Sequence, residues 1–208
     1  MIQNDPELFE LSMSEKTQPL MDLVKKHCEE NIKPIQQEYS ALQNEKEDRW
    51  SWHPRQIELM EGAKEKAREL GLWNFFLPDP DGNIGDGLTN LDYTYVANEI
   101  GKFPLASESM NCSAPDTGNM EVLERVGTEE QKKQWLEPLL NGEIRSAYAM
   151  TEPNLASSDA KNISTSAVLD GDEWVINGEK FYISGAGDPR CKIMITMVKT
   201  SPDAHPSK

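Results

Sequence analysis

A loop rich in hydroxyl and small side chains follows a strand-like segment near residue 150. Residues 151–159 read TEPNLASSD. The hydroxyls and free backbone amides of such a loop can bind an anion or the polar rim of a planar heterocycle. Many surface turns share this composition, so residue types alone do not distinguish a binding loop from an ordinary turn.

The residues that could support other kinds of chemistry are not spaced along the chain as those chemistries require. His27, His53 and His205 are not at metal-ligand spacing, so we predict no metal site. The glycine-rich segment 79–87 has Ile84 where an EF-hand loop requires glycine, and it lacks the GxGxxG pattern of a dinucleotide site. We interpret it as a loop between helices. No GxSxG nucleophile elbow is present, which leaves hydrolase chemistry without support.

Charge and cysteine content narrow the class of protein. The formal net charge of −15 disfavours binding to nucleic acid and to anionic membranes. Cys28, Cys112 and Cys191 are odd in number and far apart, which favours a reducing compartment over a disulfide framework. No secretion signal or membrane-spanning apolar run is visible. We expect a soluble intracellular protein without membrane insertion, cytoplasmic in a bacterium, with a mitochondrial or peroxisomal location possible in a eukaryote.

Helical periodicity with start and stop signals dominates the first two thirds of the chain. A capping box of Ser12 and Glu15 predicts the first helix, and Pro34 should interrupt it. The last helix should stop near Pro138. The five predicted helices span about 12–38, 54–70, 89–100, 119–126 and 128–136.

Two of these helices have a predicted buried face. In the first it comprises Leu20, Leu23, Val24, His27 and Ile32, and in the second Ile57, Met60, Ala67 and Leu70. Gly71 should end the second helix, and Thr89 with Asp92 should cap the third. Gly127 should end the fourth.

From Arg145 the period changes to two, which is typical of strands. We expect strands over 163–169, 174–176, 181–183 and 191–198, with a turn at 170–172. The fold class is therefore α+β: an N-terminal α-helical bundle domain, residues 1–144, and an incomplete antiparallel β domain, residues 145–208. Too few strands follow residue 145 to bury both faces of a sheet, so we expect a truncated chain.

Two motifs in the β part resemble a known family. The loop at 151–159 resembles the TEP…SD signature of acyl-CoA dehydrogenases, and 175–185, VINGEKFYISG, resembles their INGxKxWIT segment. Upstream, 114–119 and 127–144 are also similar to that family, so the resemblance covers nearly the whole chain. The loop, one residue longer than in medium-chain members, is closest to the subgroup typified by mammalian family members 10 and 11.

The resemblance implies FAD as cofactor and an acyl-CoA substrate. By position, the flavin contacts would come from Tyr148, Ala149, Met150, Thr151, Glu152, Pro153, Ser157, Ser158, Tyr182, Ile183 and Ser184. Ser158 would also touch the substrate, and the Ser184 hydroxyl would reach flavin N5. Tyr182 stands where the family usually has tryptophan, which leaves a smaller aromatic wall.

The resemblance also implies what this chain lacks. The family's catalytic base is a glutamate of a C-terminal helical domain, and that domain is absent here, so we predict no catalytic base among these residues. Glu152 is better interpreted as a structural hydrogen-bonding carboxylate. For the complete protein we expect oxidation of acyl-CoA to 2-enoyl-CoA, as in β-oxidation of fatty acids. Electron-transfer flavoprotein would be the partner, and the enzyme a homo-oligomer, dimer or tetramer.

Two alternatives remain open at this stage. A short chain could be a non-catalytic module that binds CoA or flavin, and a related flavin oxidase or monooxygenase would share the fold. A following reading frame with a suitably placed glutamate would exclude the first. Anaerobic reduction of bound FAD by acyl-CoA would exclude the second.

Overall fold

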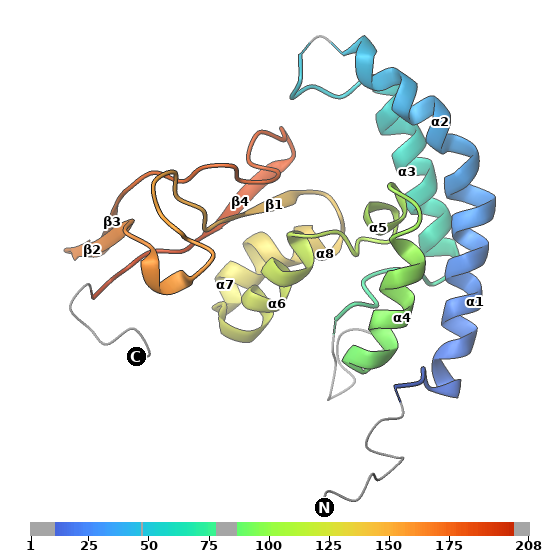
Figure 1. Ribbon diagram of the computed structural model, residues 1–208, viewed down its shortest axis with the longest axis horizontal. Coiled ribbons are helices and arrows are strands. Elements are labelled where there is room, and N and C mark those ends of the chain that lie inside the picture. The colour runs from blue at the N-terminus through green and yellow to red at the C-terminus, as the bar shows by residue number, and fades with distance from the viewer. Residues whose placement is uncertain (1–10, 47, 78–86, 202–208) are drawn as a thin grey trace, which may run out of the picture. The chain divides into compact units, whose positions relative to one another are not determined.

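The computed structural model describes residues 11–46, 48–77 and 87–201 (Figure 1). The chain forms two compact units, which divide between Thr117 and Gly118. Helices precede a small amount of sheet, which confirms the predicted fold class. The two compact units divide between residues 117 and 118, whereas the period of the sequence pattern changes at residue 145. The domain boundary proposed at residue 144 therefore stays a prediction.

The first unit begins with a long helical rod, coloured blue in Figure 1. It comprises η2 (Glu15–Thr17), α1 (Gln18–His27), the π turn η3 (Cys28–Ile32), α2 (Lys33–Ala41) and η4 (Leu42–Glu45). The predicted cap at Ser12 is wrong, because Ser14 precedes the first turn. The backbone N–H of Ser14 donates to the Asp92 carboxylate at 2.8 Å, a tertiary contact that fixes where the rod begins.

A π turn accommodates Pro34 within this rod. Proline lacks an N–H, and its ring clashes with the carbonyl four residues earlier. The N–H of Lys33 reaches back five residues to the Cys28 carbonyl, so the wider turn comes directly before the proline. The predicted interruption at Pro34 therefore takes the form of one wide turn rather than a break.

The same arrangement recurs in the second unit, where the predicted stop at Pro138 is wrong. After α7 (Glu129–Gln131) and the π turn η5 (Lys132–Leu136), helix continues through Pro138 as α8 (Glu137–Leu140). The N–H of Glu137 again bonds five residues back, to the Lys132 carbonyl. A proline at the first or second position of a helical segment needs no N–H partner, so α8 can include it.

The remaining helices of the first unit are α3 (Pro54–Glu69), α4 (Asn90–Ile100) and α5 (Ala106–Ser109). Thr89 caps α4 as predicted, because its hydroxyl accepts from the Asp92 N–H at 3.1 Å. Met60 and Ala67 are buried as predicted, but Ile57 is 51% exposed and Leu59 is buried instead. The glycine-rich segment at 79–87 lies almost wholly outside the described residues.

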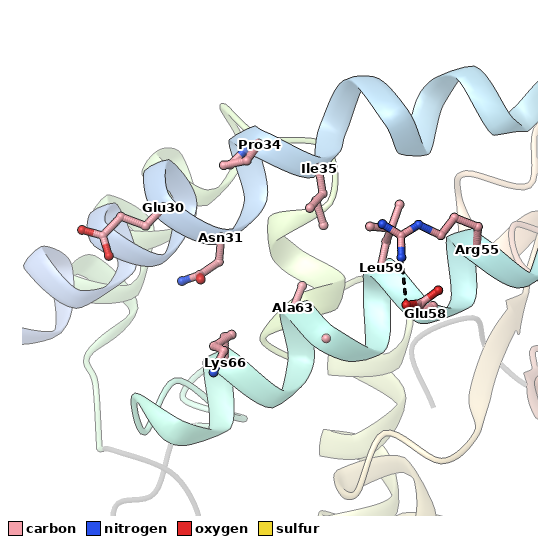
Figure 2. Close-up of a pocket in the computed structure, with 10 residues that line it drawn as sticks. Glu30, Asn31, Pro34, Ile35, Arg55, Glu58, Leu59, Ala63 and Lys66 are labelled. Atoms are coloured by element: carbon pink, nitrogen blue, oxygen red, sulfur yellow. Dashed lines mark ion pairs between the residues drawn. The ribbon is translucent and has the colours of Figure 1, made fainter.

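A shallow groove of about 280 Å³ runs between α2 and α3 (Figure 2). Figure 2 shows Pro34 and Ile35 of α2 on one side and Leu59 and Ala63 of α3 on the other. Gly62 also lines the groove, and a β-carbon built on it would meet no atom within 4 Å. The packing around this helical position therefore does not require a glycine.

We expect Gly62→Ala to stabilise the chain by about 0.5–1 kcal/mol, because alanine loses less backbone entropy than glycine when a helix forms. Urea denaturation followed by circular dichroism would measure the gain. Gly127→Ala is the opposite control, since its β-carbon would lie 2.4 Å from the Leu123 carbonyl oxygen and should destabilise. A loss of stability in Gly62→Ala would contradict the prediction.

The second unit contains most of α6 (Asp116–Val126), α7, η5, α8 and two pairs of strands. β2 (Ser166–Asp170) and β3 (Glu173–Asn177) form the predicted antiparallel hairpin, and Gly171 in its turn has φ +67°. β1 (Arg145–Ala149) and β4 (Cys191–Thr196) pair in parallel rather than antiparallel. The long connection over 150–190 allows this crossover.

One predicted strand is wrong, that at 181–183. The backbone of Tyr182 has φ +54°, in the left-handed region, so this segment cannot continue as extended strand. None of the helices in the described part of the chain has the length and apolar character to cross a membrane.

Candidate functional site

The two sequence motifs lie against one another within the second unit. The N–H of Phe181 donates to the Thr151 carbonyl oxygen at 2.9 Å. At the other end of the segment, a β-carbon built on Gly185 would lie 3.2 Å from the Ser146 carbonyl oxygen. Residues 181–185 therefore run beside 146–151 in the opposite direction, and glycine at 185, with φ +83°, permits the close approach.

Glu152 anchors this arrangement from the interior, with only 3% of its side chain exposed. Its carboxylate accepts from the Ser164 N–H at 2.8 Å, the Ser164 hydroxyl at 2.6 Å and the Thr165 N–H at 2.9 Å. The Lys180 ammonium donates to it at 2.9 Å. A carboxylate with four donors is a structural tie, which agrees with the structural interpretation of Glu152.

Electrostatics give the same result for Glu152. Burial by itself raises the pKa of this carboxyl, but the hydrogen bonds from Ser164 and Thr165 outweigh it and hold the pKa well below its usual 4.5. Glu152 is therefore a charged acceptor throughout the neutral range. A group that holds its proton so weakly is poorly suited to remove one from carbon.

The predicted contact residues divide by exposure. Tyr148, Thr151, Pro153, Ser158, Tyr182 and Ser184 are exposed, Met150 and Ile183 are half-buried, and Ala149, Glu152 and Ser157 are buried. The Ser157 hydroxyl accepts from the Glu152 N–H at 2.9 Å and thereby closes the loop. Thr151, Ser158 and Ser184 are exposed residues with hydroxyl groups, which could meet a ligand.

Ser158 sits at a fixed point of the loop. The next residue, Asp159, caps the short helix η6 (Ala160–Asn162) by accepting from the Lys161 N–H at 3.1 Å. The Asn162 side-chain amide donates to the Ala156 carbonyl at 3.1 Å. The loop that carries Ser158 is thus tied on both sides.

Tyr182 is strongly exposed, at 84%. Its ring lies 4.1 Å from that of Phe181, centroid to centroid, at an interplanar angle of 57°. The left-handed backbone at Tyr182 and this ring contact hold an aromatic surface toward solvent. Such a surface can cover the face of a flat ligand.

Sequence reasoning missed four residues that hold these segments together. Lys180, Ser164, Thr165 and Gly178 are not among the predicted contact residues, but they surround Glu152 or its neighbours. Two signals were available: a lysine and a glycine inside the second motif. Their partners lie 13 or more positions away, so spacing along the chain could not pair them.

Gly178 tests how tightly the second motif is packed. A β-carbon there would lie 2.3 Å from the Thr165 hydroxyl oxygen and 2.7 Å from the Thr165 α-carbon. We expect Gly178→Ala to destabilise the second unit by about 2 kcal/mol through overpacking, as measured by urea denaturation. Gly118→Ala, whose β-carbon would meet no atom within 4 Å, is the matched control. Equal stability of the two variants would contradict this packing.

Family models match most of the chain. The model described as "Acyl-CoA dehydrogenase, N-terminal domain" matches residues 14–143, and "Acyl-CoA dehydrogenase, middle domain" matches residues 147–207. Both the order of the two models and the position of the second, over the two motifs, agree with the resemblance.

Individual proteins agree with the family models. The chain is 48% identical to acyl-CoA dehydrogenase family member 10 of Mus musculus, over 92% of this chain and 18% of that protein. It is 48% identical to family member 11 of Gallus gallus, over 90% of this chain and 23% of that protein. The chain thus spans about a fifth of the length of these curated relatives.

A solved structure shows the same fold. A Mycobacterium abscessus protein assigned to the acyl-CoA dehydrogenases superimposes with a TM-score of 0.83 and 43% sequence identity. The match covers 93% of this chain and 48% of that one. The architecture described above therefore has an experimental counterpart.

Proposed function

Because the chain belongs to the acyl-CoA dehydrogenase family, we propose that it supplies flavin and thioester contacts to an FAD-dependent acyl-CoA dehydrogenase. When bound, FAD would supply the acceptor for the hydride that leaves the β-carbon of the acyl thioester. Loss of the α-proton to a base would complete the 2-enoyl-CoA product. The observation that carries the proposal is the close pairing of segment 181–185 with segment 146–151.

The donors exposed along this pairing suit the polar rim of a flavin. Among the described residues the Thr151 N–H has no protein acceptor, and the hydroxyls of Thr151 and Ser184 are exposed. A flavin ring carries carbonyls and ring nitrogens that need partners once they are removed from water. A row of donors without protein acceptors is a fit for such a group.

The residues would divide the work by position. Segment 148–151 would hold the polar rim, and Tyr182 with Ser184 would cover and polarise the ring. A hydroxyl donor at Ser184 would stabilise negative charge as it develops there. Ser158, outward-facing on its tied loop, would orient the thioester.

Proton abstraction is not assigned to this chain. Glu152, the buried carboxylate of the first motif, already accepts four hydrogen bonds. We therefore propose that the base belongs to another part of the complete enzyme. Passage of electrons to electron-transfer flavoprotein and assembly as a homo-oligomer are further parts of the proposal for the complete protein.

Anaerobic titration of the complete, FAD-loaded protein with acyl-CoA tests this function. Bleaching of the flavin absorbance band by a saturating concentration of acyl-CoA would support it. An unchanged flavin spectrum with acyl-CoA esters of a range of chain lengths would count against it. Residues 1–208 alone should hold FAD weakly, because the family resemblance implies that a C-terminal domain and a neighbouring subunit complete the cofactor site. Stoichiometric FAD in the purified 208-residue chain would contradict that part.

A further inference from the structure

We propose that Lys180 is a positioning residue of the flavin site, which fixes and strengthens the Thr151 N–H as a hydrogen-bond donor. The inference rests on the proposed function and deepens it. Lys180 belongs to the second motif, but its ammonium group reaches the first, where it donates to the Met150 carbonyl at 3.0 Å and to Glu152 at 2.9 Å. One side chain thus joins both motifs.

The contact with Met150 acts directly on Thr151. The Met150 carbonyl and the Thr151 N–H belong to one peptide unit, so a cation on the oxygen draws electron density away from the nitrogen. Hydrogen bonds in series polarise one another, by roughly 10–30% per bond. The Thr151 N–H, which has no protein acceptor in the described part of the chain, becomes a stronger donor toward whatever lies outside.

Burial makes this effect larger than it would be in water. The Lys180 side chain is 11% exposed and its partner Glu152 is 3% exposed. A charge-assisted hydrogen bond in such surroundings is shielded little by solvent. Glu152 in turn is held by Ser164 and Thr165, so the ammonium group cannot swing away from the Met150 carbonyl without leaving a buried carboxylate short of a partner.

The geometry also fixes the direction of the donor. The Phe181 N–H holds the Thr151 carbonyl at 2.9 Å, and Lys180 holds the carbonyl just before Thr151. Both peptide units that flank Thr151 are therefore restrained. A donor held in place before a ligand arrives costs little reorganisation on binding.

The experiment compares variants of the 208-residue chain by amide NMR. Lys180→Gln keeps a donor without the charge, and Lys180→Met removes both. Lys192→Gln is the matched control, since its ammonium group also donates to a backbone carbonyl, that of Pro189 at 2.8 Å, but in an exposed position. We expect the Thr151 amide proton to move upfield in both Lys180 variants and to stay in place in Lys192→Gln.

Affinity for FAD provides a second reading, through quenching of flavin fluorescence. In the complete protein, at a temperature at which each variant is fully folded, Lys180→Gln should bind FAD roughly tenfold more weakly than wild type, which corresponds to about 1.4 kcal/mol. Lys180→Arg, which restores the charge, should recover most of the affinity. If Lys180 had a merely structural role, a fully folded Lys180→Gln variant would bind FAD with the affinity of the wild type.

The outcomes separate this inference from the proposed function. A folded Lys180→Gln with the wild-type Thr151 amide shift overturns the role of Lys180, whatever its affinity for FAD. If Lys180→Met fails to fold, the Thr151 amide shift and the FAD affinity of Lys180→Gln and Lys180→Arg still test the proposal. Failure of the complete wild-type protein to bind FAD would count against the proposed function, while the amide comparison would still test the polarisation.

Discussion

Glu152→Ala is expected to lower the free energy of unfolding of the second unit by about 3–5 kcal/mol. The substitution leaves the Lys180 ammonium buried without its carboxylate and removes the acceptor of three other hydrogen bonds. Breaking a buried ion pair from one side costs this much because the remaining charge is uncompensated. Urea denaturation at neutral pH would measure the loss.

Two further variants make the Glu152 result specific. Glu152→Gln keeps the shape and one acceptor, so it should lose less than alanine does. Glu173→Ala removes an exposed carboxylate from the hairpin of the same unit and should change stability by less than about 0.5 kcal/mol. Equal losses in Glu152→Ala and Glu173→Ala would show that the tie around Glu152 contributes nothing.

Acidification is expected to destabilise the first unit through His27. Its imidazole is fully buried, and burial lowers the pKa of His27 from 6.5 to about 4. Because the folded state holds this ring neutral while the unfolded chain protonates it, stability falls as the pH drops from about 6.5 toward 4. The loss attributable to His27 should reach up to about 3 kcal/mol.

The hydrogen bonds of His27 explain why the neutral ring is preferred. One ring nitrogen lies 2.9 Å from the Ser109 hydroxyl, which donates onward to the Ala106 carbonyl, and the Asn31 amide faces the other nitrogen at 3.3 Å. A second ring proton, on the nitrogen that faces Asn31, would point at the N–H of the Asn31 amide rather than at an acceptor. Urea midpoints between pH 7 and 4.5 should fall less steeply in His27→Gln, and parallel slopes for the two proteins would refute the assignment.

Local signals predicted much of this fold. The Thr89 cap, the turn around Gly171 and the Gly127 end of α6 depend on residues close together in sequence, and all three were predicted in place. The pairing of the two motifs is a different case. It depends on the Lys180–Glu152 contact, whose partners are 28 positions apart, so the sequence indicated each motif but not what joins them.

Errors arose where tertiary contacts override local preference. Ile57 has the apolar character of a core residue, but it lies on the exposed side of α3. Tyr182 has the composition of a strand, but its backbone is left-handed, a choice that alternation along the chain cannot reveal. The outward-facing ring that results is the feature most relevant to ligand binding.

The π turn before Pro34 has a consequence for how helical sequences are aligned. A wide turn adds one residue to the helix, which rotates everything after it by about 100° relative to an uninterrupted helix. A helical wheel drawn from α1 therefore assigns the wrong face to α2, and deletion of one residue from Cys28–Ile32 should remove the wide turn while the same residues of α2 still face α3. A relative with a regular helix in place of this wide turn should therefore align with a gap of one residue here, so that the buried faces after the turn still correspond.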